Sequence, residues 1–449
     1  MVTILATIFV LGILIFVHEL GHFLIAKWVG IGVPRFSIGL GPKIFGLKRG
    51  ETEYRLAWIP FGGYVKMAGD RTAEAIEGGG EGQEFPPEKE FDRKPIRARL
   101  MVVCAGSAMN FIWAILVFSW IFYTSGLQSL PTTKVGDVKW PQGNVVAGFE
   151  NLNPGCVLTT INGESHSTWD EFMEAIINSE GELNLAWIDS TGTAFETTVM
   201  ANDSLRQVIV TSIMPFVEPE VGVVRKGGPA DKAGIKEGDR FLFIEKDGKR
   251  HAINRWLDAV NVIHASPEEE LILTMQRGDS VYTVNVVPMR QKIPDSETTM
   301  REVGLIGISR MSVTSPLSFF QSISEGTHRS FYLAAYILDL LGKLITGDIS
   351  PRLIGGPILV GQMAGESAKQ GFSTLLSFMA LFSVNLAVLN MLPVPVLDGG
   401  HVVFLFLEFI RRKPLTVEQR AKISQVGFIL LILLMVFVTF NDSLRLLGF

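Results

Sequence analysis

The sequence predicts a mainly α-helical membrane protein with four transmembrane helices, a cytoplasmic membrane-associated β-hairpin and a large soluble insertion. Four apolar runs are long enough to cross a bilayer, which takes about 20 residues at a rise of about 1.5 Å each. Hydrophobic residues make up 47% of the 449-residue chain, but charged residues still make up 19%. This mixture indicates membrane helices joined to soluble modules.

Charge and cysteine content exclude several classes of function. A net charge of −5 gives no reason to expect nucleic acid as a partner. Cys104 falls in an apolar run and Cys156 in a soluble region, so we expect neither a disulfide between them nor a cysteine-based metal site. The first apolar run lacks a basic start and a small-residue cleavage site, so it is not expected to be a cleaved signal peptide.

The first predicted span, residues 1–29, contains the sequence His18-Glu19-Leu20-Gly21-His22. Residues four apart share one face of a helix, so His18 and His22 can bind one metal ion, with Glu19 between them as the candidate general base. A single membrane histidine is usually a satisfied core residue. Ionisable groups inside a membrane helix are costly unless they are paired or bound to metal, and three at this spacing favour a metal site.

The next segment, residues 30–98, is dense in Lys and Arg and is therefore expected to be cytoplasmic, which places the N-terminus outside. Within it, residues 51–67 predict a β-hairpin whose turn includes Gly62 and Gly63. An edge strand can pair with an extended substrate, which makes Gly62, Gly63 and Tyr64 candidate substrate-binding residues. A purely structural hairpin is equally compatible with the pattern.

The second predicted span, residues 99–124, runs outward. Small residues around Gly106 allow close helix packing, and Asn110 is a polar residue in an apolar setting. Asn110 is either a hydrogen-bonding residue between helices, which we favour, or a group near the metal site.

A soluble insertion, residues 127–292, is expected outside the cytoplasm and carries a weak internal repeat with copies at 127–212 and 213–292. The order of turn, strand, Asn/Asp-Gly turn, strand and helix resembles tandem PDZ domains, which are α+β folds. The second copy matches better, because the first has Cys156 where the pattern usually has Asp. PDZ domains bind peptide termini by adding a strand at a sheet edge. A size filter that binds no peptide is the open alternative.

Residues 293–373 predict interfacial helices and loops in the periplasm, with one short strand at 303–309. Residues 374–410 predict a third span that ends in a broken segment and a half-helix, and residues 423–440 predict the fourth span. Two prolines and two glycines interrupt the third span. A broken helix at membrane depth survives only where it lines a cavity in the protein. Four spans place both termini outside the cytoplasm.

Two histidines leave a zinc site short of the three protein ligands that catalytic zinc usually has. Asp398, in the broken segment, is the best third ligand. His18 lies about 15 residues and Asp398 about 24 residues into two spans that both run inward, so both fall toward the cytoplasmic leaflet. His401 is a less favoured alternative. Asn390 is a candidate for hydrogen bonding to the substrate backbone.

The HELGH sequence, the tandem PDZ pattern and the run from Asn385 to His401, with Asn390, Pro393, Pro395 and Leu397-Asp398-Gly399-Gly400, together resemble the site-2 protease family of intramembrane zinc metalloproteases. The resemblance covers nearly the whole chain. It departs at Ser107, where the family usually has proline in the second span.

The resemblance implies a multi-pass protease of the bacterial inner membrane with periplasmic PDZ domains. It implies Zn²⁺ bound by His18, His22 and Asp398, Glu19 as the base, and Asn390 in contact with substrate. The implied substrates are single-pass membrane proteins in the lipid bilayer, such as an anti-sigma factor of the envelope stress response that another protease has first trimmed, and remnants of signal peptides.

Two other classes of function compete with a protease. A membrane scaffold would carry PDZ domains beside a structural metal site, but a structural site needs no base such as Glu19. A metal or ion transporter could use histidine and aspartate within the membrane. Four spans, one metal site and a large soluble insertion fit a transporter poorly.

Overall fold

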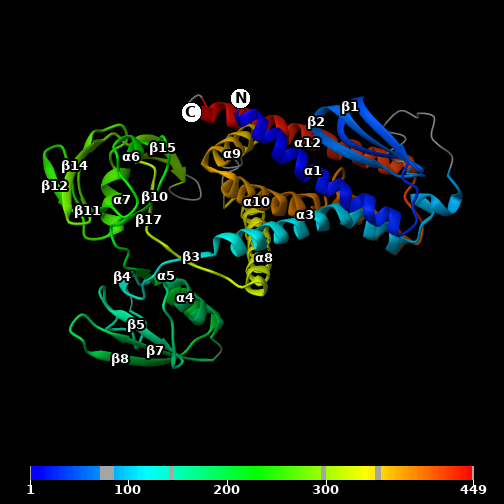
Figure 1. Ribbon diagram of the computed structural model, residues 1–449. Helices are drawn as coiled ribbons and strands as arrows, with labels where there is room; N and C mark the ends of the chain where they lie inside the picture. The colour runs from blue at the N-terminus through cyan, green and yellow to red at the C-terminus, as the bar shows by residue number, and fades with distance from the viewer. Residues whose placement is uncertain are drawn as a thin grey trace. The chain divides into compact units, whose positions relative to one another are not determined.

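A computed structural model describes residues 2–70, 85–141, 145–179, 181–294, 300–348 and 355–446. The chain forms a membrane unit, Met1–Ser125 with Leu317–Phe449, and an insertion unit, Gly126–Pro316 (Figure 1). Among the described residues, four helices are long and apolar enough to cross a membrane: α1 (Val2–Trp28), α3 (Ile96–Ser125), α10 (Phe372–Asn390) and α12 (Val417–Leu446). This confirms the predicted number of spans.

Close packing brings α1 against α3. Gly21 has no side chain, and a Cβ atom there would lie 2.3 Å from the carbonyl oxygen of Ala105. A larger residue would force the two helices apart. Because Gly21 lies within the HELGH sequence, this contact places both histidines beside α3.

Two further helices complete the bundle. Helix α8 (Phe319–Thr346) packs on α3, where Leu333 is buried among Ala114 and Val384 of the neighbouring spans. Helix α9 (Pro357–Gln370) packs on α1, and its first turn is capped by a residue of α12. The carboxylate of Asp442 accepts hydrogen bonds from the backbone N–H groups of residues 356, 358 and 359.

The third predicted span is two helices separated by a break. Helix α10 ends at Asn390, and α11 (Asp398–Arg411) begins after a non-helical segment. Gly399 and Gly400 allow α11 to start against this segment, because Cβ atoms there would lie 2.2 Å from the Leu392 oxygen and 2.3 Å from the Val394 oxygen. The break therefore holds Asp398 at the first position of α11.

The β-hairpin lies beside α1, and it includes a strand and a turn that were not predicted (Figure 1). Strand β1 (Arg35–Arg49) pairs with β2 (Thr52–Lys66) around a turn at residues 50–51. Gly50 supplies the positive φ, +61°, that this turn needs. Residues 53–56 pair with 35–38 in parallel, whereas residues 63–66 pair with the same segment antiparallel, so the chain also reverses at the turn predicted within Pro60 to Gly63. The two predicted strands pair with β1 between them rather than with each other. Residues 39–49 are rich in glycine and basic residues, so this segment lacks the regular alternation of apolar and polar residues that would have predicted β1.

Two α+β modules make up most of the insertion unit. The first module contains β4 (Val135–Val138), β5 (Val157–Ile161), β6 (Glu164–Ser165), α4 (Trp169–Asn178), β7 (Glu182–Ile188), β8 (Ala194–Met200), α5 (Asp203–Ser212) and β9 (Ile213–Pro215). Its sheet has the order β6-β5-β7-β8, while β4 pairs with β9. The paired strand β9 thus lies beyond residue 212, where the first copy was predicted to end.

The second module repeats this order. It contains β10 (Val221–Val224), α6 (Pro229–Lys232), β11 (Arg240–Lys246), β12 (Lys249–Ala252), α7 (Trp256–His264), β13 (Leu271–Arg277), β14 (Ser280–Val286), β15 (Met289–Pro294), β16 (Met300–Leu305) and β17 (Ile308–Arg310). Its sheet has the order β12-β11-β13-β14, and β10 pairs with β17. The predicted strand at 303–309 is two strands, and the insertion extends past the predicted end at 292.

The two ends of the insertion lie side by side. Strand β3 (Leu127–Ser129) pairs with β18 (Val313–Ser315) in antiparallel register. Each module also has its own buried core, centred on Phe149 and Phe172 in the first and on Phe241 and Leu273 in the second. The insertion is therefore a pair of modules, and its first and last strands pair with each other.

Candidate metal centre

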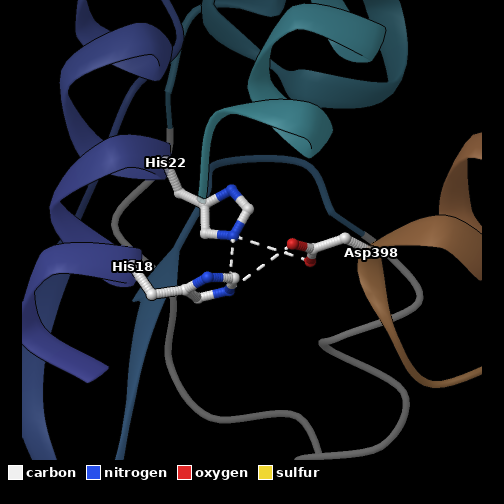
Figure 2. Close-up of side chains that lie close together, drawn as sticks. All are labelled: His18, His22 and Asp398. Atoms are coloured by element: carbon white, nitrogen blue, oxygen red, sulfur yellow. Dashed lines mark hydrogen bonds and ion pairs between the residues drawn. The ribbon is translucent and has the colours of Figure 1, made fainter. Parts of the chain in front are cut away.

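Three side chains from two distant parts of the sequence converge on one point (Figure 2). His18 and His22 project from adjacent turns of α1, and Asp398 projects from the start of α11. The Nε2 atoms of the two histidines are 3.2 Å apart. Asp398 Oδ2 lies 3.4 Å from His18 Nε2, and Asp398 Oδ1 lies 3.6 Å from His22 Nε2.

These distances fit a zinc ion. Two imidazole nitrogens and one carboxylate oxygen are a donor set found in catalytic zinc sites. Ligand atoms about 2.0–2.2 Å from zinc in a tetrahedral arrangement lie about 3.3–3.6 Å from one another. The three ligand atoms are also the group of potential metal ligands found among the described residues. His401, the alternative ligand, lies near Asp398 but outside this group.

Helix α3 forms the wall behind the histidines. A Cβ atom on Gly106 would lie 2.3 Å from His22 Nε2 and 2.6 Å from His18 Cε1. Even alanine at this position would therefore displace the imidazoles. The glycine is required for space, because a helical residue needs no unusual backbone angle.

Residues of α3 also contact each ligand residue, and the sequence revealed little of this. The backbone oxygen of Val102 lies 2.8 Å from His22 Nδ1. Ser107 Oγ donates to Asp398 Oδ2 at 3.2 Å. A backbone acceptor has no signature in a sequence, and Ser107 was notable only as a departure from the family pattern.

Asn110 combines the two roles considered for it. Its side-chain nitrogen lies 3.5 Å from His18 Nδ1 of α1, so the polar side chain contacts a neighbouring helix and lies beside the candidate metal centre. The hydrogen bond that Ser383 of α10 donates to Asn110 at 2.8 Å uses the backbone oxygen and not the side chain.

A cavity of about 210 Å³ opens on the other side of the ligands. Glu19, His22 and Asp398 lie in its wall, together with polar and apolar residues of neighbouring elements: Tyr64, Val65, Met67, Asp70, Phe91, Val103, His401 and Arg420. A cavity that is polar and much larger than a water molecule can hold water. The candidate base therefore faces a space in which water can reach the ligands.

The end of β2 borders this cavity beside Glu19. A Cβ atom on Gly63 would lie 3.1 Å from Glu19 Cγ, so the strand backbone approaches the candidate base closely. Tyr64 lies in the cavity wall, and its hydroxyl accepts hydrogen bonds from Arg55 and Arg35. Gly62 contacts Leu40 instead and has a φ of +117°. Asn390 makes no hydrogen bond to the three ligand residues in the described part of the chain.

A buried ion-pair network includes Arg420, one of the residues in the cavity wall. Arg420 of α12 lies 3.1 Å from Asp92 and 3.6 Å from Glu408 of α11. Glu408 also accepts two hydrogen bonds from Arg99 of α3, at 3.0 and 2.5 Å. Two cations and two anions balance one another, so the network ties three helices together without adding net charge near the ligands.

Comparisons with known proteins agree with this geometry. The family model described as peptidase family M50 matches residues 6–434. A protein of Neisseria meningitidis named as a zinc metalloprotease is 34% identical over 466 residues, which cover 99% of this chain and 100% of that one. Protease RseP of Yersinia pestis is 32% identical, with 98% of each chain covered. The regulator of sigma-E protease RseP of Escherichia coli is 31% identical, with 97% of each covered.

The matched region includes α1 with both histidines and α11 with Asp398. The resemblance to site-2 proteases that the sequence suggested is thus confirmed across nearly the whole chain. The chain belongs to peptidase family M50, the site-2 proteases.

Proposed function

We propose that this protein is an intramembrane zinc metalloprotease that hydrolyses a peptide bond within a transmembrane helix of its substrate. The observation that carries this proposal is the convergence of His18, His22 and Asp398 beside Glu19, at the wall of a partly polar cavity. A zinc ion in this site would lower the pKa of a water molecule to about 7 and polarise the scissile carbonyl.

Glu19 is the residue placed to move the proton. It neighbours the ligand His18 in sequence and faces the cavity, where it can accept a proton from the attacking water. It then returns the proton to the leaving amine. Gly106 lets α3 lie directly against both imidazoles, which fills the space behind them.

The substrate must unwind locally, because peptide bonds within a helix are hydrogen-bonded and covered by side chains. The end of β2 beside Glu19 supports a role in holding the unwound segment by strand pairing, through Gly62, Gly63 and Tyr64. Asn390 ends α10 just before the break, and we assign it a hydrogen bond to the substrate backbone. We propose this placement of the substrate together with the catalytic function.

We propose that the protein lies in the bacterial inner membrane. The Lys- and Arg-rich segment between α1 and α3 supports a cytoplasmic position for the hairpin and the cavity mouth. Both termini and the insertion unit are then periplasmic. The names of relatives that regulate sigma-E support membrane-spanning anti-sigma factors as one substrate class, with remnants of signal peptides as another.

The two insertion modules are assigned as PDZ domains that select substrates. Their repeated strand order supports this assignment. We propose that they exclude substrates with bulky periplasmic parts. Deleting the whole insertion unit, residues 126–316, should then allow untrimmed substrate to be cleaved, whereas unchanged selectivity would contradict the size filter.

The decisive experiment replaces Glu19 by Gln, which keeps the size of the side chain but removes the base. Parent and variant are reconstituted in lipid vesicles with a single-pass substrate, and cleavage and zinc content are both measured. We expect Glu19→Gln to lose about 10²–10⁴-fold in cleavage rate while it retains zinc. His22→Ala should lose both. A scaffold or a transporter predicts no cleavage by the zinc-loaded parent, which would refute the proposal.

A further inference from the structure

We propose that α3 positions all three metal ligands, each through one hydrogen bond: His22 donates to Val102, His18 donates to Asn110, and Asp398 accepts from Ser107. The three α3 residues, with Gly106, lie on the face of this helix that contacts the site. The inference rests on the proposed zinc site. It assigns roles that neither the sequence pattern nor the family match supplies.

The contact to His22 fixes its proton. A backbone carbonyl can only accept, so the 2.8 Å contact between Val102 oxygen and His22 Nδ1 places the imidazole hydrogen on Nδ1. The lone pair of Nε2 then faces His18 and Asp398. This is the arrangement of a ligand histidine held by a partner on its other nitrogen.

The same reasoning indicates that the side-chain oxygen and nitrogen of Asn110 should exchange positions. If its nitrogen donated to His18 Nδ1, the ring would carry its hydrogen on Nε2, which faces His22 Nε2 at 3.2 Å and Asp398 Oδ2 at 3.4 Å, and this hydrogen would prevent Nε2 from binding a metal. Asn110 Oδ1 is buried and has no hydrogen-bond partner among the residues that the structure describes, so no such bond fixes the amide orientation. Oxygen and nitrogen exchange by rotation within nearly the same shape. We therefore assign Oδ1 to His18 Nδ1–H, which leaves Nε2 free for the metal.

Ser107 holds the carboxylate. Its side chain is 4% exposed, and its hydroxyl donates to Asp398 Oδ2 at 3.2 Å. A helical serine commonly bonds a carbonyl of its own helix, as Ser119 of α3 does to Ile115 oxygen at 2.7 Å. Site-2 proteases usually have proline at the position of Ser107, and proline cannot donate. This bond is therefore a feature of this chain rather than of the family pattern.

Zinc affinity tests the proposal without requiring catalysis. The full-length protein is purified in detergent, loaded with zinc and titrated with a competing chelator, and its zinc content is measured by mass spectrometry. Partners of this kind contribute about 10–100-fold to metal affinity. We expect Ser107→Ala and Asn110→Leu each to weaken zinc binding by about 10–100-fold. Ser119→Ala, a buried serine on the same helix, is the matched control and should bind zinc as the parent does.

Asn110→Asp distinguishes the two amide orientations. It can accept from His18 Nδ1–H but cannot donate, so it should retain zinc at least as well as the parent. If the nitrogen of Asn110 were the contacting atom, Asn110→Asp would bind zinc as poorly as Asn110→Leu. Asn110→Ala replaces Asn110→Leu should the larger side chain prevent folding, which is checked by size-exclusion chromatography.

The outcomes separate this inference from the proposed function. Parental zinc affinity in both Ser107→Ala and Asn110→Leu would overturn the positioning roles, even in an active protease. Weakened affinity in a zinc-loaded protein that cleaves no membrane substrate would support the positioning roles and refute the protease. A parent chain that binds no zinc would overturn both.

Discussion

The two insertion modules share one backbone arrangement but have different side chains at an equivalent buried position. In the first module, the Val135 N–H donates to the carbonyl oxygen of Cys156 at 2.7 Å. In the second, the Val221 N–H donates to the carbonyl oxygen of Asp239 at 2.8 Å. The residue before each acceptor is a glycine with positive φ, +97° and +83°. Cys156 and Asp239 therefore occupy equivalent positions, as the sequence repeat predicts.

In the second module this position anchors a hydrogen-bonded network. The Asp239 carboxylate is fully buried and accepts two hydrogen bonds from Arg277, at 2.7 and 2.8 Å. It also accepts from the Tyr282 hydroxyl and the Lys236 N–H, each at 2.6 Å. The buried charge is thus paired and bonded on both oxygens.

The strand register shows what the first module has instead. Val157 pairs with Ile188 where Arg240 pairs with Gln276, so the next residue, Asp189, takes the position of Arg277. By the same comparison along β7–β8 and β13–β14, Phe195 takes the position of Tyr282.

The comparison indicates that these three positions differ between the two modules as a set. A carboxylate at Cys156 would face Asp189 rather than an arginine. The thiol avoids that conflict, because it is buried as a small apolar group with only weak contacts, at 3.4 Å and 3.7 Å. Asp189 in turn is free to cap its own turn through Thr191 and Thr193. A motif residue is thus determined by partners far along the chain.

The largest effect is expected from Cys156→Asp, which gives the first module the carboxylate without its partners. Cys156 is 2% exposed, and burying an unpaired charge costs about 3–5 kcal/mol. Hydrogen exchange in the full-length protein should show the opening free energy of β5 and β7 falling by this amount, with β11 and β13 unchanged. Undiminished protection of β5 would contradict the argument. Cys156→Ala, which adds no charge, is the control.

Adding Asp189→Arg and Phe195→Tyr to Cys156→Asp sharpens the comparison. The triple variant reproduces the network of the second module at equivalent positions. We expect it to recover most of the protection that Cys156→Asp loses. If protection is not recovered, the equivalent positions derived from the strand register do not explain why one module buries a carboxylate and the other a thiol.

Asp239→Ala should have the next largest effect, in the second module. It leaves the Lys236 N–H and the Tyr282 hydroxyl without an acceptor. The side chain of Arg277 is 41% exposed, so its charge can be hydrated, and the cost stays below that of Cys156→Asp. We expect a loss of about 2–3 kcal/mol in the opening free energy of β11 and β13 by hydrogen exchange. An equal loss in β5 would mean that the modules do not unfold separately.

The sequence predicted those features that local spacing or repetition encodes. The four-residue spacing of His18 and His22 predicted a shared metal, and the prolines and glycines near Asp398 predicted a break in a membrane helix. The repeated turn and strand pattern predicted two modules. Each of these depends on residues close together in the chain or on a pattern that occurs twice.

The remaining features depend on tertiary contacts. The role of Val102 is carried by a backbone oxygen, which no residue type reveals. Ser107 contacts Asp398 only because α3 and α11 pack together, 291 residues apart in sequence. The sequence did not reveal that β1 lies between the two predicted hairpin strands, where residues 35–38 pair with 53–56 on one side and with 63–66 on the other. Packing overrides local preference at these points.

Acid should weaken the second module through Asp239, a charge that has no counterpart at Cys156. Burial raises the pKa of the Asp239 carboxyl, but hydrogen bonds from Arg277, the Lys236 N–H and Tyr282 outweigh burial and hold the pKa below its ordinary value. The unfolded pKa is about 3.9, so the stabilising contribution is complete above about pH 5 and is lost as pH falls through the lower folded pKa. Cys156 does not change charge in this range.

Hydrogen exchange corrected for intrinsic rates tests this between pH 6 and 3, values at which other carboxyls also titrate. Asp239→Ala therefore serves as the reference. The difference in β11 protection between parent and Asp239→Ala should shrink as pH falls, and it cannot exceed the effect of the substitution itself. A difference that stays constant to pH 3 would show that Asp239 gains no stability from being charged.

Tyr282→Phe should have the smallest effect, because it changes only one residue of the network, to the residue type that Phe195 supplies at the equivalent position of the first module. The hydroxyl donates to Asp239 and accepts from Arg277 at 3.0 Å. Burial and the bond to Asp239 raise the pKa of Tyr282 to about 12, so the hydroxyl still donates at neutral pH. Without it, Asp239 keeps both bonds from Arg277, and we expect a loss of about 1 kcal/mol in β13 and β14 protection. A loss as large as that of Asp239→Ala would mean that the tyrosine, rather than the arginine, makes the buried carboxylate tolerable.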